Sequence, residues 1–267
     1  MPITLILIFV FSFGLIMGSF LNCLVWRLHK KESLLGRSYC PKCRNQIAWY
    51  DNIPVLSFIL LGGKCRQCKK PISWQYPLVE LTAGILFVLA YYLNYELQIM
   101  NYGVVAYNSS FVIQLLRDWF LICVMTVIFI YDLRWYLILD IITLPACLVV
   151  LIFNLILGFS LWNLLISGII GGSFFLIQFV ISKGKWIGGG DIRLGLLIGL
   201  ALGWPGVLVS IIISYFIGSV VGLSLITAGK KKWGSEVPLG VFLAVGSIIT
   251  LFWQAQILNW YLNISIF

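Results

Sequence analysis

The stretch Gly188-Gly189-Gly190-Asp191-Ile192-Arg193-Leu194 leads directly into an apolar run that continues to Leu202. The three glycines allow the backbone to bend and to approach other groups closely. An ionisable side chain at the edge of a hydrophobic run is costly unless it has a partner or a task. Asp191 is therefore a candidate site residue. The alternative interpretation is that Asp191 only caps a helix that begins at Ile192, because Asp is a favoured N-cap residue.

The composition of the whole chain is that of a membrane protein. Of its 267 residues, 61% are hydrophobic and 10% are charged, whereas soluble domains contain about 25% charged residues. We therefore predict an all-α polytopic membrane protein. The single histidine, His29, makes a Ser-His triad, a His-ligated metal site or a His general base hard to assemble. Any hydrolysis would have to depend on carboxylates.

Eight apolar segments are judged as transmembrane helices against the need for about 20 apolar residues. We predict these spans at residues 1–26, 76–95, 112–131, 138–158, 161–182, 191–203, 206–228 and 238–262. The sixth span is short, so it would tilt, thin the bilayer or fail to cross. The domains predicted from this pattern are a first transmembrane helix (1–26), a polar loop domain (27–75) and a transmembrane core (76–267).

The positive charges give these helices a direction. If the N-terminus is outside, the inner connections are residues 27–75, 132–137, 183–193 and 229–237, and they hold 17 of the 18 Lys and Arg residues. Only Arg117 lies on the outer side. Since inner loops of membrane proteins carry the excess of Lys and Arg, we predict that the polar loop and both ends that carry Asp132 and Asp191 are cytoplasmic.

Four cysteines form two CxxC pairs in the polar loop. Cys40-Pro-Lys-Cys43 and Cys65-Arg-Gln-Cys68 are separated by 21 residues. This spacing is typical of two knuckles that present four thiolates to one tetrahedral Zn²⁺. We predict a structural zinc site formed by Cys40, Cys43, Cys65 and Cys68, and the alternative is that these cysteines are reduced and metal-free.

The same loop is strongly basic, with ten Lys and Arg residues against Glu32 and Asp51. Its aromatic residues do not form a recognisable nucleic-acid module, and it is tethered between two spans. Attraction to anionic lipid headgroups explains the charge more simply. We predict membrane lipids as partners and no nucleic acid.

A second carboxylate lies at the same predicted rim as Asp191. Phe129-Ile130-Tyr131-Asp132-Leu133-Arg134 ends one span, and Asp140 begins the next. Two carboxylates brought together can share a proton, so that one deprotonates water while the other protonates the substrate. Such a pair cleaves amides without metal, histidine or serine, so Asp132 and Asp191 are the predicted catalytic pair.

Each acidic residue also has a structural interpretation. Asp132 would pair with Arg134 on a solvated turn, and Asp140 would cap its own helix. Asp132 ends a predicted helix and Asp191 begins one, and a helix dipole disfavours negative charge at its C-terminus and favours it at its N-terminus. We therefore hypothesise that Asp132 holds the proton and Asp191 acts as the base.

Over nearly its whole length the chain resembles the bacterial type IV prepilin peptidases. The matching segments are Gly18-Ser-Phe-Leu-Asn22, Trp26-Arg27-Leu28, Cys40-Pro-Lys-Cys43, Trp49-Tyr50-Asp51-Asn52-Ile53-Pro54, Cys65-Arg-Gln-Cys68, Tyr76-Pro77-Leu-Val-Glu80-Leu81, Gly188-Gly189-Gly190-Asp191, Val237-Pro238-Leu239-Gly240 and Phe242-Leu243-Ala244. One departure concerns the turn after Asp132. The family usually has Leu-Pro-Asp where this chain reads Ile138-Leu139-Asp140.

The resemblance implies an aspartic membrane endopeptidase with Asp132 and Asp191 as its pair. It implies removal of the short basic leader of type IV prepilins or pseudopilins after a glycine, at the cytoplasmic face of the bacterial inner membrane. It further implies N-methylation of the new N-terminus with S-adenosylmethionine. Asn22 and Glu80, at cytoplasmic helix ends, are the candidate cofactor-binding residues, although Glu80 would alternatively be a carboxylate that snorkels toward Arg27 or Lys64.

Three other functions compete with this prediction. The nearest is a prepilin peptidase without methyltransferase activity. A transporter would place its acidic residues near the middle of the bilayer, whereas these lie at one rim. A noncatalytic membrane anchor for the zinc module would tolerate replacement of Asp132 or Asp191 by Asn.

Overall fold

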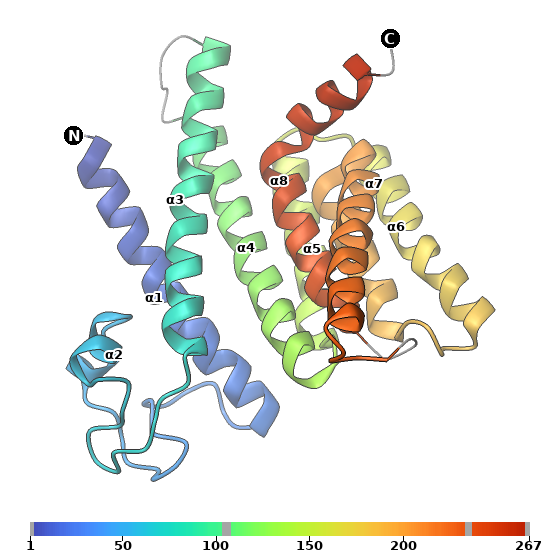
Figure 1. Cartoon of the computed structure of the whole chain (residues 1–267). Helices are drawn as coiled ribbons and strands as arrows, with labels where there is room; N and C mark the ends of the chain where they lie inside the picture. The colour runs from blue at the N-terminus through green and yellow to red at the C-terminus, as the bar shows by residue number, and fades with distance from the viewer. Residues whose placement is uncertain (1–2, 103–107, 233–236, 265–267) are drawn as a thin grey trace. The chain divides into compact units, whose positions relative to one another are not determined.

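The structure, a computed structural model, describes residues 3–102, 108–232 and 237–264 (Figure 1). All regular elements in these residues are helices, and the only β-type pairings among them are two isolated bridges, Tyr39 with Gln46 and Lys64 with Pro71. The elements are α1 (Ile3–Lys30), η1 (Trp49–Asn52), α2 (Leu56–Leu60), α3 (Gln75–Tyr102), α4 (Ser109–Trp135), α5 (Asp140–Ile156), α6 (Leu161–Ser182), α7 (Gly189–Thr227) and α8 (Leu239–Ile264). The predicted all-α fold is confirmed.

The chain forms two compact units, Met1–Val105 and Ala106–Phe267. The first contains α1, α3 and the cysteine-containing loop between them, and the second contains α4 to α8. Each unit is described by itself. The predicted division into residues 1–26, 27–75 and 76–267 stays a prediction.

Each of the eight predicted spans overlaps a helix. Within the described residues six helices are long and apolar enough to cross a membrane, namely α1, α3, α4, α6, α7 and α8. The apolar helix α5 is shorter, with 17 residues. Two predicted spans, 191–203 and 206–228, both lie in α7, which has 39 residues and leaves helical geometry at Gly203 (φ 63°, ψ −173°) and Trp204 (φ −87°, ψ 137°). The protein is therefore a multi-pass membrane protein in which α7 consists of two helical halves.

The chain reverses direction at the break in α7. A Cβ atom on Gly171 of α6 would lie 2.3 Å from the carbonyl oxygen of Gly195 and 3.1 Å from Cγ2 of Val207. In one straight helix, residues twelve apart are separated by about 18 Å, so these two neighbours of Gly171 must lie on helices that run past each other. The second half also packs along α8, because Gly218 lies against Phe242. The first half, from Gly189 to the break, spans only about 20 Å, as its short apolar run predicts.

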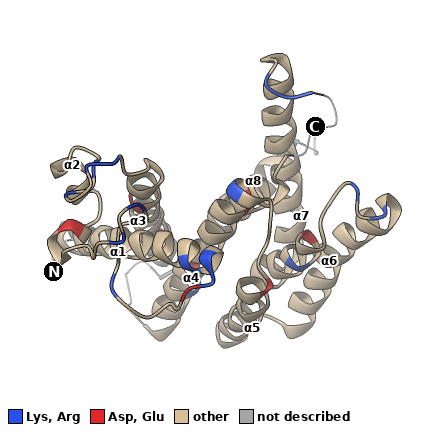
Figure 2. Cartoon of the chain, turned by 90° about the horizontal axis from the view of Figure 1, so that it is seen from below, with Lys and Arg blue, Asp and Glu red and all other residues tan. Residues whose placement is uncertain are grey.

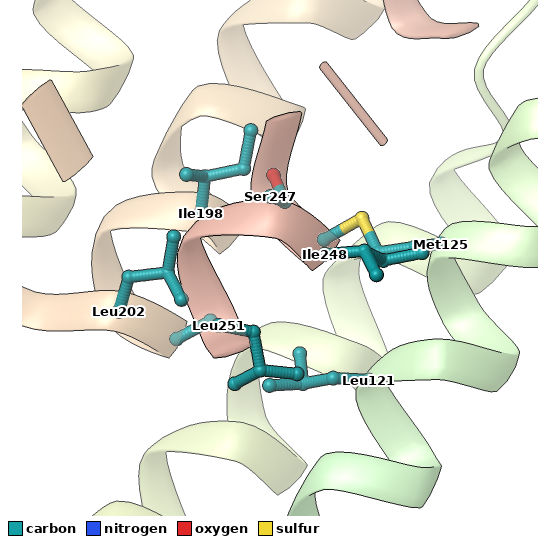
Figure 3. A pocket seen from close by; sticks show the side chains of 8 residues that line it. Leu121, Met125, Ile198, Leu202, Ser247, Ile248 and Leu251 are labelled. Carbon is teal, nitrogen blue, oxygen red and sulfur yellow. The ribbon is translucent and has the colours of Figure 1, made fainter. Parts of the chain in front are cut away.

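The core of the second unit is apolar and closely packed. Leu121, Met125, Ile198 and Leu243 are buried where α4, the first half of α7 and α8 meet. The void between these helices has a volume of about 10 Å³ (Figure 3). That is about the space of one water molecule, so this void cannot admit a peptide substrate. A site for chemistry must lie at the ends or on the outer faces of these helices.

Charged residues gather at the ends of the helices. Figure 2 shows Lys and Arg on connections between helices of the second unit. In the second unit these connections include Lys183 and Lys185 after α6, and Lys230 and Lys231 after α7. The acidic site residues of this unit also lie at helix ends, Asp132 at the end of α4 and Asp191 at the start of α7.

Candidate active site and candidate metal centre

Asp132 lies in the last turn of α4 and is only 5% exposed. Its Oδ2 accepts a hydrogen bond from the backbone N–H of Val241 at 3.1 Å, in the first turn of α8. A Cβ atom on Gly240 would lie 2.8 Å from the same oxygen, so this close approach requires a residue without a side chain. The first N–H groups of a helix have no partners within the helix. The start of α8 therefore supplies the donors that hold the Asp132 carboxylate.

This arrangement changes two expectations about Asp132. It is paired with the start of α8 rather than with Arg134, whose guanidinium lies 5.8 Å from the ring centroid of Trp135. The hypothesis that Asp132 holds the proton took account of the dipoles of the helices that carry Asp132 and Asp191, but not of the dipole of α8. Because the carboxylate also faces the N-terminus of α8, where a negative charge is favoured, that ground for placing the proton on Asp132 is removed.

Asp191 is the third residue of α7 and is only 7% exposed. Its Oδ2 accepts a hydrogen bond from the backbone N–H of Gly188 at 2.9 Å. Asp191 thus does cap a helix, but from inside the first turn, because α7 begins at Gly189 and not at Ile192. Its other oxygen, Oδ1, accepts no hydrogen bond from the described residues. That oxygen remains available to water or to a substrate.

The structure brings Asp132 and Asp191 to one end of the second unit. Ile138, in the turn between α4 and α5, touches the backbone beside both carboxylates: a Cβ on Gly190 would lie 2.8 Å from Cβ of Ile138, and a Cβ on Gly240 would lie 3.1 Å from its Cδ1. Two acidic groups from distant parts of the chain therefore lie beside the same turn between α4 and α5.

Asp140 was expected to cap its own helix, and this expectation is wrong. It is the first residue of α5, whose N-cap position is Leu139 and has no side-chain cap. Asp140 instead forms an ion pair with Arg193 of α7. This ion pair joins the start of α5 to the start of α7, where Arg193 lies two residues after Asp191. The opposite charges at one predicted rim were the only sequence signal for this contact.

The missing proline leaves the turn after Asp132 intact. Leu139, which stands where the related sequences have proline, adopts φ −85° and ψ 122°. This φ lies close to the range that proline enforces. Leucine therefore takes the proline-like conformation, and the carbonyl of Leu139 still accepts the first bonds of α5 from Ile142 and Thr143.

In the first unit, the four predicted zinc ligands come together. The Sγ atoms of Cys40, Cys43, Cys65 and Cys68 all lie within 4.8 Å of one another, and those of Cys40 and Cys68 are 4.0 Å apart. Four sulfurs placed tetrahedrally around Zn²⁺ at 2.3 Å are about 3.8 Å apart. The sulfur cluster is therefore a metal-binding site, and its geometry fits a tetrahedral ion.

The two CxxC pairs fold into equivalent knuckles. In the first, the N–H of Arg44 donates to the carbonyl of Cys40 at 2.8 Å; in the second, the N–H of Lys69 donates to the carbonyl of Cys65 at 3.0 Å. Arg44 and Lys69 both adopt positive φ, 60° and 55°. The same turn is built twice, so two thiols from each turn face the same point.

Two thiols of the cluster have pKa values that differ in opposite directions from the ordinary value. The backbone N–H groups of Cys68 and then Gln67 hold the pKa of Cys65 down at about 7. The N–H of Asn45 lowers the pKa of Cys43, but burial and the neighbouring sulfurs of Cys40 and Cys68 outweigh it and raise that pKa to about 11. A bound metal replaces the protons of such thiols, so binding would release protons.

Asn22 and Glu80, the candidate methyl-donor residues, are buried where α1 packs against α3. Asn22 is 2% exposed; its amide nitrogen donates to the carbonyls of Gly18 and Tyr76, and its oxygen accepts from Gln75. All of these partners belong to the protein itself. Both N–H groups of the Asn22 amide are therefore used, and its oxygen accepts one hydrogen bond.

Glu80 is 6% exposed and has a different task from the one expected. Its Oε2 accepts a hydrogen bond from the backbone N–H of Val55 at 2.7 Å. Val55 begins α2 at φ 61° and ψ −50°, an unusual conformation for a β-branched residue. Glu80 does not snorkel toward Arg27, which is buried and donates to the carbonyls of Gly36 and Arg37. Asn22 and Glu80 both make hydrogen bonds within the first unit, and their role as methyl-donor residues stays a prediction.

Comparison with known proteins extends over almost the whole chain. Residues 12–94 match the Bacterial Peptidase A24 N-terminal domain, and residues 119–223 match the Type IV leader peptidase family. Two proteins named prepilin leader peptidase/N-methyltransferase are each 30% identical to this chain over 286 residues. The match to the protein from Aeromonas salmonicida covers 95% of this chain and 93% of that protein. The match to the protein from Pseudomonas aeruginosa covers 94% of this chain and 92% of that protein. The protein of that name from Aeromonas hydrophila is 31% identical over 284 residues, with coverage of 95% and 93%.

No solved structure matches the chain. The two family models together cover the cysteine loop, most of the first helix and most of the two helices that carry Asp132 and Asp191. Both the buried carboxylate pair and the four-cysteine cluster lie inside the matched regions. On these grounds the chain belongs to the type IV leader peptidase family.

Proposed function

We propose that this protein cleaves the leader peptide of type IV prepilins or pseudopilins and then methylates the new N-terminus. The observation that carries the peptidase assignment is the pair of buried carboxylates, Asp132 and Asp191, at one end of the second unit. Each is held by a backbone N–H at the start of a helix. The names of the relatives support both activities.

In the proposed hydrolysis, the two carboxylates share one proton. The ionised carboxylate takes a proton from a water molecule, whose oxygen bonds to the scissile carbonyl carbon, while the protonated carboxyl gives its proton to the carbonyl oxygen. The C–N bond of the resulting tetrahedral intermediate then breaks. The leaving nitrogen takes up a proton, so the products are a leader with a free carboxyl group and a pilin with a free amine.

The backbone donors in this site fix the positions of the two acids before substrate arrives. Val241 N–H and Gly188 N–H each occupy an Oδ2 atom, so rotation of either carboxylate would break a hydrogen bond. Groups that are already oriented need no reorganisation during the reaction. Ile138 and the glycines that it touches close the space around the pair.

We place the active site at the cytoplasmic face of the bacterial inner membrane, with the N-terminus of the protein outside. The support is the distribution of Lys and Arg, of which 17 of 18 lie in the inner connections of this arrangement. Water is available at this face, so it does not have to be carried into hydrocarbon. A substrate can then keep its apolar helix in the bilayer while its leader remains in water.

We infer that the metal held by the four-cysteine cluster is structural Zn²⁺. Bound zinc would fix the four thiolates in one tetrahedron and thereby stabilise the loop. Arg66, inside the second knuckle, also forms a two-pronged ion pair with Asp51 at 2.7 and 2.8 Å. The basic surface of the loop suits anionic lipid headgroups.

The proposed methyl donor is S-adenosylmethionine, which would supply the methyl group to the new amine. Asn22 and Glu80 remain proposed for this activity only through the resemblance, since their polar atoms are used within the protein. We therefore assign no step of the transfer to them.

The proposal is tested by incubating the purified protein with a prepilin and labelled S-adenosylmethionine. Cleavage is read from the shift in substrate mass, and methylation from label in the processed product. We expect cleavage by the wild type and none by Asp132→Asn or Asp191→Asn, each of which removes a charge at constant shape. Cleavage that survives either substitution would refute the catalytic assignment. That outcome would instead fit a transporter or a noncatalytic membrane anchor. Cleavage without label would identify a peptidase that lacks methyltransferase activity.

A further inference from the structure

A polar pair lies on the outer face of two membrane-spanning helices, close to Asp191. The hydroxyl of Tyr215, in the second half of α7, donates to Oε1 of Gln178 on α6 at 2.9 Å. Tyr215 is 36% exposed. Figure 1 shows α6 and α7 side by side. Polar groups on a face turned toward lipid are costly unless they have partners or a task.

The pair keeps hydrogen-bonding capacity after its two groups have bonded to each other. The amide nitrogen of Gln178 makes one long contact, 3.4 Å to the carbonyl of Phe174, and has a second N–H without an acceptor among the described residues. The oxygen of Tyr215 uses its proton but can still accept. One donor and one acceptor side by side match the C=O and N–H groups of an extended peptide backbone.

The position of the pair connects it with the proposed chemistry. Gly172 of α6 lies against the backbone carbonyl of Ile192, the neighbour of Asp191. The segment of α6 from Gly172 to Gln178 therefore runs past the start of α7.

A groove lies farther along the same two helices. Near the break in α7, a groove of about 290 Å³ is lined by Asn163, Ile166, Ile170 and Trp204. These three α6 residues, followed by Phe174 and Gln178, recur every three or four positions, which places them on one helix face. From Asn163 to Gln178 this face is about 22 Å long. That length suits several turns of an apolar helix that ends at the polar pair.

We propose that this face of α6 and α7 receives the transmembrane helix of the substrate, and that Tyr215 and Gln178 bind its backbone where it leaves helical form beside Asp191. The proposal rests on the peptidase function proposed above. The occupant is an apolar helix followed by extended chain, because the face is apolar between Asn163 and Gln178 and its end near the carboxylates offers an unused donor and an unused acceptor. Lipid tails satisfy the apolar part alone.

Photo-crosslinking gives the first test. Benzoylphenylalanine is introduced at the position of Gln178 and, as a matched control, at that of Leu144, an exposed residue four positions into α5 from the same end of the unit. We expect a crosslink to full-length prepilin in membranes from position 178 and at least roughly tenfold less from position 144. Equal capture at the two positions, in a protein whose wild type cleaves prepilin, would overturn this proposal and leave the peptidase function standing.

Kinetics give the second test. Tyr215→Phe and Gln178→Leu should each raise KM roughly 5-fold, the effect of one lost hydrogen bond, with little change in kcat and unchanged thermal stability. Tyr261→Phe, at the far end of α8, serves as the control and should behave as wild type. An unchanged KM in both variants, or a fall in kcat and stability together, would show that the pair only supports packing. If the wild type itself did not cleave, the peptidase function would fail first.

Discussion

The metal centre and the carboxylate pair are assembled in opposite ways. In the first unit, each cysteine knuckle is closed by hydrogen bonds between residues four or five positions apart, such as Arg44 to Cys40. In the second unit, Asp132 accepts from Val241, 109 positions away, and Asp140 pairs with Arg193, 53 positions away. A local site should therefore tolerate remote changes, whereas the carboxylate site should depend on how helix ends meet.

The largest expected effect comes from breaking the carboxylate pair. Asp132→Asn and Asp191→Asn should each reduce prepilin cleavage by about 10²- to 10⁴-fold or more, and the double variant should be no slower than the worse single variant, because the two acids act as one unit. Zinc content should stay at the wild-type value. Initial rates of cleavage measure this, and losses that multiply in the double variant would contradict a shared role.

Breaking the metal centre should have the opposite pattern. Cys40→Ser and Cys65→Ser should each remove bound zinc, since four ligands are needed for a closed structural site. Metal analysis of the purified protein should show a fall from about one zinc per chain to nearly none, and the loop should become sensitive to protease. Cys23→Ser, on α1 outside the cluster, is the control. Unchanged zinc in Cys40→Ser would refute the metal assignment.

A third substitution tests the structural task assigned to Glu80, a buried carboxylate of the first unit. Glu80→Gln should weaken the hold on the N–H of Val55 and lower the free energy of local opening by about 1–3 kcal/mol. Faster hydrogen exchange at Val55 and its neighbours measures this. Glu96→Gln, on the exposed part of α3, should leave exchange unchanged. If Glu80→Gln instead abolished binding of S-adenosylmethionine and left exchange at Val55 as in wild type, Glu80 would be a ligand for the methyl donor.

A smaller effect is expected where the ion pair of Asp140 and Arg193 joins α5 to α7. The pair is about half exposed, so its loss should cost only about 0.2–1 kcal/mol, and either Asp140→Arg or Arg193→Asp should slow cleavage a few-fold. The charge-swapped double variant should recover most of the rate. Equal rates in the single and double variants would mean that the pair does not position Asp191.

The smallest expected effect is the pH dependence of the stability of the cysteine-containing loop in the first unit. Hydrogen bonds from Arg66 lower the pKa of Asp51 below its ordinary value of 3.8. Because the folded pKa is lower than the unfolded one, this ion pair should stabilise the loop fully above pH 3.8 and lose its effect as pH falls through the lowered value. Asp51→Asn should remove this dependence from the hydrogen exchange of the loop. A rise in stability on acidification would contradict it.

Much of the protein could be predicted without coordinates, and the misses have a common cause. The eight apolar segments, the four cysteines and the two acidic candidates were all identified from patterns that neighbouring residues carry. Three partners could not be predicted: Val241 for Asp132, Arg193 for Asp140 and Val55 for Glu80. For Asp132 and Asp140 the partner is brought close by packing of helices that are remote in the chain, and for Glu80 the partner lies in the folded loop 25 positions earlier.

Sequence alone determined the membrane character of this protein and its metal-ligand set. Apolar runs of spanning length must be removed from water, and two CxxC turns orient their own thiols through local hydrogen bonds. Only the tertiary structure decided that the start of α8 supplies the donor for Asp132, because that N–H lies 109 positions away in the chain. The physical reason is that unpaired N–H groups exist at every helix start, and helix packing selects which distant carboxylate those of α8 meet.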